Sequence, residues 1–160
     1  MQNIRVICVG KLRDRFFSEA ANEYIKRMSA YCNIEIIEIP EHRLPDSPSA
    51  SEISKALAKE CALIEDKIPS GAACAALCIE GESIDSPGLS ALLTKYAVSG
   101  VSKLCFIVGS SYGLHTSIKS KSDIMLSMSK MTFPHTLARV ILLEQLYRAL
   151  SIAGGGKYHK

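Results

Sequence analysis

Stretches of apolar residues that suit β-strands alternate five times with stretches whose apolar residues recur at helical spacing. This alternation constrains the fold more than any other feature of the chain. The strand-like stretches are short, apolar and mostly bounded by Gly or Pro, and they cover residues 4–9, 34–39, 72–79, 103–108 and 124–128. Such a pattern predicts an α/β domain with a largely parallel sheet of five or six strands flanked by helices.

Each strand is followed by a segment with helical signals. Residues 16–28 have apolar side chains at helical spacing, and the segment 40–50 that precedes the second helix holds three prolines and predicts a loop. Ser49 and Glu52 fit a capping box at the start of that helix. Ser86 is expected to cap a third helix with Pro87 at its first position. A short helix over 116–122 and a last helix over 134–153 complete the series.

The length of 160 residues favours one domain that spans residues 1–160, large enough to bury a core without disulfides or a structural metal. No stretch approaches the ~20 apolar residues that a membrane helix needs. The first apolar run, 4–9, is too short for the core of a signal peptide. We therefore expect a cytoplasmic protein with no membrane partner.

The six cysteines show no metal-ligand spacing. There is no C-x-x-C pair and no His spaced like a zinc ligand. Four of the cysteines lie in apolar strand-like runs, which is typical of buried, reduced thiols. We expect no metal.

Positive charge is concentrated in the last quarter of the chain. Residues 1–120 contain 13 Lys and Arg against 14 Asp and Glu, whereas residues 121–160 contain 6 against 2. A locally basic end suits an anionic partner such as RNA, although a solvated helix face gives the same pattern. Charge alone does not decide between these two interpretations.

Ligands of parallel sheets usually bind beyond the carboxyl ends of the strands. The loops to inspect are therefore Glu80–Ser83, Gly109–Gly113 and Ser129–Phe133. Glycines in the second loop allow a close backbone approach to a ligand, but a tight strand-to-helix turn needs them equally. The loop is neither a dinucleotide fingerprint nor a P-loop.

Polar residues near the C-terminus are candidates for chemistry. His135 falls in the first turn of the last helix and shares a helical face with Arg139, four residues on. Glu144 and Arg148 form another such pair, for which a surface ion pair of little energetic value is the simpler interpretation. The terminal Tyr158-His159-Lys160 combines an aromatic ring, an imidazole and a cation, which suit base stacking and phosphate contacts.

Taken together, three segments resemble a known family. They are SMSKMTFPHTLARVILLEQLYRALSI at 127–152, IVGSSYGLH at 107–115 and the terminal YHK. The sequence is similar to the ribosomal RNA large subunit methyltransferase H family of the SPOUT class, and the likeness extends over nearly the whole chain. The resemblance implies a single SPOUT-type domain with a trefoil knot near the C-terminus.

The resemblance also implies an activity and a site. The expected enzyme is a homodimer that uses S-adenosylmethionine to methylate N3 of a pseudouridine in 23S ribosomal RNA on assembled ribosomes. The implied donor-binding residues are Leu77, Gly109, Met128, Ser129, Lys130, Met131, Thr132 and Phe133. The implied catalytic residues are His159, Tyr158 and Arg148, and the implied RNA-binding residues are His135, Arg139 and Lys160.

The chain departs from the family pattern at two places. Ser110 stands where the family often has a second glycine after Gly109, and its backbone N–H is still available to a donor. The three glycines 154–156 make the tail more flexible than in typical members.

Three other functions remain open from the sequence. A related enzyme could methylate a ribose hydroxyl or transfer RNA, and a non-catalytic ribosome-binding module could use the same sheet. A flavodoxin-like flavin protein is disfavoured, because the chain has no Trp and no Ser/Thr-rich phosphate loop follows its first strand.

Overall fold

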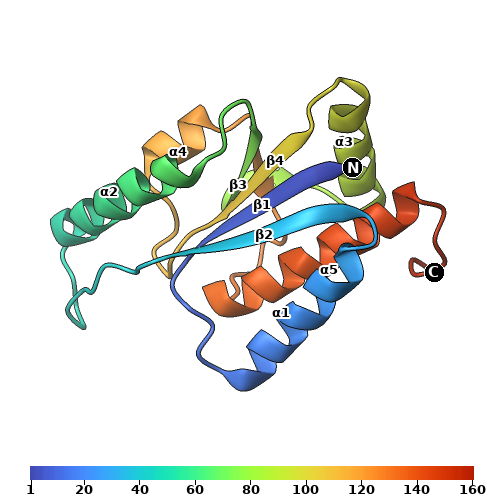
Figure 1. Ribbon diagram of the computed structural model, residues 1–160. Helices are drawn as coiled ribbons and strands as arrows, with labels where there is room; N and C mark the ends of the chain where they lie inside the picture. The colour runs from blue at the N-terminus through green and yellow to red at the C-terminus, as the bar shows by residue number, and fades with distance from the viewer.

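The computed structural model describes all residues 1–160 as one five-stranded sheet flanked by five helices (Figure 1). The strand order is β2-β1-β4-β3-β5, and every neighbouring pair is parallel. This confirms the predicted parallel α/β architecture. In chain order the elements are β1 (Gln2–Val9), α1 (Arg15–Met28), β2 (Cys32–Ile39), α2 (Ala50–Lys67), β3 (Ala73–Ser83), α3 (Ser86–Val98), β4 (Lys103–Val108), α4 (Thr116–Lys121), β5 (Ile124–Ser127) and α5 (His135–Ala153).

Helices cover both faces of the sheet, so that each face has its own apolar core. One core joins α1, α3 and α5 to the sheet, and the other joins α2 and α4 to the opposite face (Figure 1). Within β1, Ile4 and Val6 face the first core and Ile7 faces the second. A strand that is buried on both sides reads as a continuous apolar run, which is why the strands were recognisable in the sequence.

The third strand continues beyond the predicted end at residue 79. β3 pairs with β5 up to Leu77, loses register, and pairs again at Glu82 and Ser83. The predicted loop Glu80–Ser83 is therefore wrong: these residues belong to an irregular strand. A β-carbon added at Gly81 would lie 2.6 Å from the backbone of Leu126, so only glycine permits this approach.

The N-cap residue of α2 agrees with the sequence prediction, whereas that of α3 does not. Ser49 accepts the backbone N–H of Glu52, and the Glu52 side chain accepts that of Ser49, which confirms the capping box. At α3 the cap is Asp85, whose carboxylate accepts the N–H of Gly88 at 2.7 Å. Ser86 is already helical and its hydroxyl donates to Gln145 instead, so the predicted Ser86 cap is wrong.

All six cysteines are free, and all except Cys78 are buried, as predicted. Burial raises the pKa of the Cys8 thiol to about 12, which keeps it protonated. None of the helices is both long and apolar enough to cross a membrane.

Candidate functional site

A cavity lies at the carboxyl ends of β3, β4 and β5, and the first turn of α5 closes one side of it. This cleft measures about 760 Å³, a size typical of cofactor sites. All the predicted donor-binding residues except Lys130 line it: Leu77, Gly109, Met128, Ser129, Met131, Thr132 and Phe133. Segments separated by more than 50 residues in the sequence thus share one cavity.

The Gly109–Gly113 turn forms one wall of the cleft. A β-carbon at Gly109 would lie 2.3 Å from the carbonyl oxygen of Gly113, so the turn closes only around glycine. The N–H of Gly113 donates to the carbonyl of Ser110 at 2.9 Å, and Gly113 has a positive φ of 82°. These contacts fix the shape of the turn, whose residues Gly109 to Gly113 all line the cavity.

The segment after β5 forms the opposite wall. The Ser127 hydroxyl donates to the carbonyl of Ser129 at 3.0 Å, and the Ser129 hydroxyl accepts the N–H of Met131 at 2.9 Å. These bonds shape a polar loop whose Met131 side chain is 67% exposed. Pro134 is the N-cap of α5, which begins at His135, one residue after the predicted start.

Other lining residues had no signal in the sequence: Cys78, Ile79 and Lys119. Cys78 and Ile79 lie where β3 loses its register, and Lys119 reaches the cleft from α4, where it pairs with Glu80. Glu80 belongs to a segment, 80–83, that the sequence did single out. An irregular strand register and the docking of a short helix are tertiary features that spacing cannot reveal. Ser110 and Ser111 lie in a loop that the sequence did single out.

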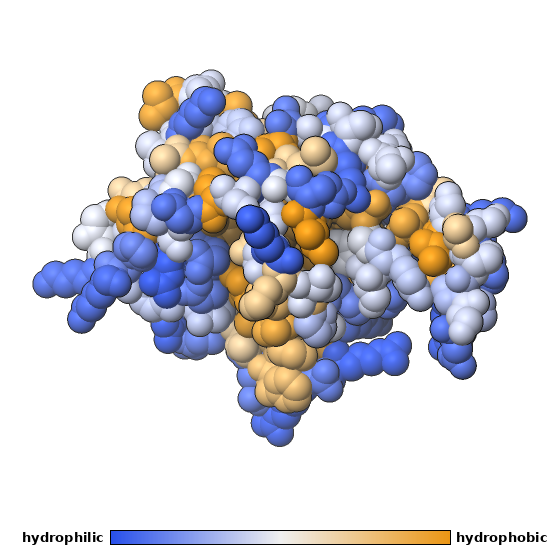
Figure 2. All heavy atoms as spheres, turned by 180° about the vertical axis from the view of Figure 1, so that it is seen from behind, coloured by the Kyte–Doolittle hydropathy of each residue, from blue (hydrophilic) through white to orange (hydrophobic).

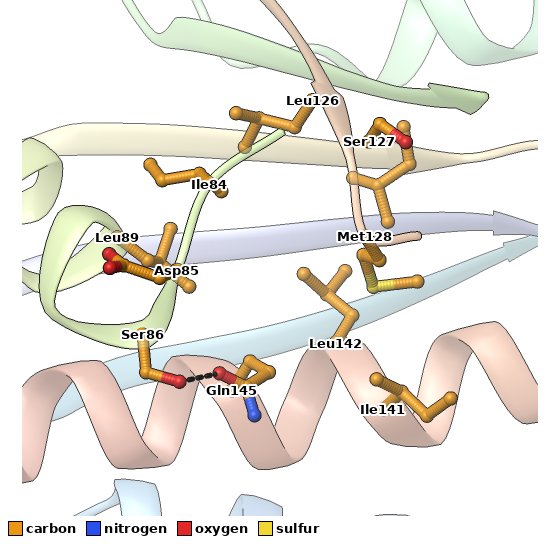
Figure 3. A pocket seen from close by; sticks show the side chains of 11 residues that line it. Ile84, Asp85, Ser86, Leu89, Leu126, Ser127, Met128, Ile141, Leu142 and Gln145 are labelled. Atoms are coloured by element: carbon orange, nitrogen blue, oxygen red, sulfur yellow. Dashed lines mark hydrogen bonds between the residues drawn. The ribbon is translucent and has the colours of Figure 1, made fainter. Parts of the chain in front are cut away.

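A smaller apolar recess adjoins the cleft. It measures about 300 Å³ and lies between the end of β5, the start of α3 and the middle of α5. Figure 3 shows Leu126, Met128 and Leu142 gathered in this recess, with Ser86 and Gln145 hydrogen-bonded to each other at 2.6 Å. The recess and the cleft share the wall residues Leu77, Leu126, Ser127 and Met128. The two spaces therefore belong to one region.

His135 and Arg139 share a face of α5, as predicted, and both lie beside Gly10, but their surroundings differ. His135 lines the cleft, with Nδ1 3.3 Å from the Ser111 hydroxyl. Arg139 is only 3% exposed; it donates to Glu38 at 2.9 Å and to the carbonyl of Gly10 at 2.7 Å, and its Nε has no partner. Arg139 is therefore not available for the predicted RNA contact. Its guanidinium instead joins α5 to the ends of β1 and β2.

The three predicted catalytic residues meet around Glu144. This carboxylate accepts from Arg148 at 2.9 Å and from the Tyr158 hydroxyl at 3.2 Å. The Arg148 guanidinium lies 4.6 Å from the centre of the Tyr158 ring, and its Nη1 lies 3.5 Å from Nδ1 of His159. The pKa of Tyr158 is raised to about 12, first by burial and then by a hydrogen bond with Tyr24, so its hydroxyl keeps its proton. Lys160 is exposed.

Within one chain, this cluster is remote from the cleft. His135 stands at the first turn of α5 and Arg148 is thirteen residues further along, which is roughly 20 Å along a helix axis. In Figure 1 the tail emerges at the far end of α5. One copy of the chain therefore does not bring the tail residues to the cleft. No group of three or more His, Cys, Asp or Glu side chains is placed to hold a metal ion.

Solved structures share this fold. A chain from Haemophilus influenzae Rd KW20, provisionally described as a methylase family protein, matches with a TM-score of 0.61 and 13% identity over 99% of this chain and 71% of its own. A chain from Bordetella pertussis Tohama I, provisionally described as a methyltransferase, gives a TM-score of 0.58 and 17% identity over 93% and 96%. At these identities the likeness concerns the fold alone.

Sequence relatives are much closer. The ribosomal RNA large subunit methyltransferase H proteins of Bacillus thuringiensis and Bacillus anthracis are 41% identical over 158 residues, or 99% of either chain. A protein of Methanococcus maripaludis, provisionally given the same name, is 44% identical over the same share. Residues 2–159 match the family described as "Predicted SPOUT methyltransferase". The chain therefore belongs to the SPOUT methyltransferase family and, within it, to the ribosomal RNA large subunit methyltransferase H enzymes.

Proposed function

We propose that this chain transfers a methyl group from S-adenosylmethionine to N3 of a pseudouridine in 23S ribosomal RNA on assembled ribosomes, and so acts in the cytoplasm. The full-length identity to ribosomal RNA large subunit methyltransferase H proteins supports the substrate class. The observation that carries the donor assignment is the cleft, where Leu77, Gly109 and residues 128–133, Lys130 apart, surround one cavity.

The cleft suits a cofactor with apolar, polar and charged parts. Leu77, Met128 and Phe133 supply apolar surface, whereas Ser129 and Thr132 supply polar groups. Gly109 and Gly113 also line the cleft, and a ligand can approach the backbone of a glycine closely because it carries no side chain. S-adenosylmethionine would bring a methyl group already activated on a sulfonium, so the protein needs mainly to position the base.

The tail residues would act on the base and the RNA backbone. During transfer the proton on N3 must leave, and imidazole is the side chain that most readily exchanges a proton near neutral pH. We assign the removal of this proton to His159. Tyr158 would stack on the base or hydrogen-bond to it, and Arg148 would contact the phosphates of the RNA. Glu144 holds Arg148 and Tyr158 together. Lys160 and His135 are assigned to RNA contacts.

A homodimer would join the two halves of this site. Because the tail cluster and the cleft are roughly 20 Å apart along α5, the tail of one copy must serve the cleft of another. Helix α5 has apolar residues on all sides, and Leu137, Ile141 and Ile152 remain partly exposed. A helix that is apolar all round is normally covered. Figure 2 shows apolar residues gathered across the middle of one face of the molecule, as a dimer surface requires.

The trefoil knot is the remaining part of the proposal. β5 lies at the sheet edge beside β3, and α5 then returns across the sheet between α1 and α3. The close approach of Gly81 to the backbone of Leu126 holds β3 tightly against β5, the strand that leads into α5. Both features support a threaded C-terminal segment.

Two experiments test the function. Isothermal calorimetry should show S-adenosylmethionine binding to the purified chain, whereas a pure ribosome-binding module would give no heat. Mass spectrometry of RNA from a strain that lacks the chain should show the loss of one N3-methylpseudouridine from 23S RNA. Loss of a ribose methyl or of a transfer RNA methyl would overturn the substrate assignment.

Replacing His159 with Ala should abolish methylation and leave donor binding near normal, because His159 is assigned to the base and is not among the residues that line the cleft. Unchanged turnover in this variant would end the assignment of His159.

A further inference from the structure

The donor cleft contains one pair of oppositely charged side chains. Apart from the titratable His135, Glu80 of β3 and Lys119 of α4 are the only charged residues that line it. The two pair with each other: Nζ of Lys119 donates to Oε1 of Glu80. The hydrogen bond from Lys119 lowers the pKa of Glu80, so the carboxylate stays ionised at neutral pH.

The charged pair and the apolar part of the cleft lie on different sides. Helix α4 packs with α2 on one face of the sheet, whereas α3 and α5 cover the other face (Figure 1). Lys119 enters the cleft from α4, while Leu126 and Met128 line both the cleft and the apolar recess between α3 and α5. The cleft therefore suits a ligand with an apolar ring system at one end and charges at the other.

The docking of α4 does not depend on this pair. Ile118 anchors the helix in the core beneath α2 and is 2% exposed. A second ion pair, from Lys121 to Glu65 of α2 at 2.7 Å, already joins α4 to its neighbour. The Glu80 side chain is 54% exposed, and an ion pair so open to water adds little stability. A ligand in the cleft explains the position of the pair better than stability does.

The two side chains have the chemistry to bind an α-amino acid. Glu80 is the only hydrogen-bond partner of Lys119 Nζ, which has three N–H groups and so keeps donors for a ligand carboxylate. The Glu80 carboxylate only accepts and can take the N–H groups of a ligand ammonium. Both contacts would be charge-assisted and therefore stronger than those between neutral groups. S-adenosylmethionine carries such an ammonium and carboxylate on one carbon of its methionine part.

We propose that Lys119 and Glu80 form the subsite for the amino-acid end of the methyl donor: Lys119 binds its α-carboxylate and Glu80 binds its α-ammonium group. This inference rests on the proposed donor site and deepens it. The amino-acid end then lies toward α4, and the nucleoside lies toward the apolar side of the cleft.

The test compares two donor analogues by calorimetry. S-adenosylhomocysteine carries the amino-acid end, whereas 5′-methylthioadenosine has the same thioether nucleoside without the ammonium and carboxylate. The wild type should bind S-adenosylhomocysteine roughly tenfold more tightly. Lys119→Met should weaken this binding by roughly fivefold to twentyfold and change that of 5′-methylthioadenosine by less than about twofold. Glu80→Gln should show the same selectivity with a loss of roughly threefold, because water screens its more exposed charge.

Two further variants separate charge recognition from a structural role. Lys121→Met removes the other ion pair of α4, outside the cleft lining, and should leave both affinities unchanged. Lys119→Arg keeps the positive charge and should retain most of the preference for S-adenosylhomocysteine.

Three results would overturn the subsite. They are equal losses for both ligands in Lys119→Met, unchanged S-adenosylhomocysteine binding in that variant, and a wild type that binds both ligands equally well. A wild type that binds neither ligand would instead overturn the proposed donor site itself.

Discussion

Individual residues of this site differ in how well their surroundings could be predicted from the sequence. The resemblance identified Gly109 and residues 128–133, and the structure shows all of these except Lys130 around one cavity. For Arg139 the helical spacing predicted a face shared with His135, but it could not predict that Glu38 and the carbonyl of Gly10 lie against the guanidinium. Partners brought together by folding decide whether an arginine is available to RNA.

Replacing Gly109 with Ala should damage the donor cleft. The new β-carbon would meet the carbonyl of Gly113 at 2.3 Å and force the turn to move. We expect donor affinity measured by calorimetry to fall roughly tenfold or more, with a stability loss of about 1–3 kcal/mol. Gly71→Ala is the matched control, because it strains a positive φ far from the cleft and costs about 1–2 kcal/mol. Normal donor binding in Gly109→Ala would contradict this account of the cleft wall.

Cys78 reports on occupancy of the cleft. It is the only cysteine that is not fully buried, and it lines the cavity beside Leu77. Its alkylation by N-ethylmaleimide, followed by mass spectrometry, should slow by roughly tenfold when S-adenosylhomocysteine is present at ten times its Kd. The five buried cysteines serve as internal controls and should react only after unfolding. Equal Cys78 rates with and without the ligand would place the donor elsewhere.

At the scale of elements, the sequence was most informative where local chemistry determines the structure. All five strands and five helices were predictable because each strand is a compact apolar run, and the Ser49 capping box is a local hydrogen-bond pattern. The continuation of β3 past residue 79 was not predictable, since it depends on pairing with β5, as between Glu82 and Leu126. The same long-range pairing moves Cys78 and Glu80 into the cleft.

Removing the capping box should destabilise α2. Ser49→Ala leaves the N–H of Glu52 without its side-chain acceptor, which typically costs about 1 kcal/mol. Urea unfolding would measure this. Ser51→Ala, on the exposed side of the same first turn, should cost nothing measurable. Equal stability of the two variants would mean that the cap contributes nothing.

Glu60 of α2 is 3% exposed, and this burial raises its pKa, which predicts a pH effect on stability. In the range above its ordinary value of 4.5, the folded chain still holds a proton that the unfolded chain has lost. The contribution of Glu60 to stability is therefore greatest at low pH and declines as pH rises through the folded pKa. Glu60→Gln removes this decline. Urea unfolding from pH 4 to 8 should therefore show the free energy of unfolding of the variant rising relative to that of the wild type. A constant difference across that range would contradict the raised pKa.

At the scale of the whole molecule, one chain holds two half-sites at opposite ends of α5. The donor cleft lies at the His135 end, and the cluster of Arg148, Tyr158 and His159 lies beyond the other end of the helix. The sequence, through its family resemblance, identified both groups. It could not give their separation, because that depends on the length of the helix between them and on where the tail folds back. The proposed homodimer is the arrangement that would join the two groups despite this separation.

Mixing two inactive variants tests this central claim most directly. Thr132→Trp would fill the cleft from an exposed position, whereas His159→Ala would disable the tail. If sites form between copies, each mixed dimer contains one intact site, and random exchange should restore about a quarter of the wild-type transfer of labelled methyl to ribosomes. Recovery no greater than the sum of the two separate variants would show that each chain works with its own tail.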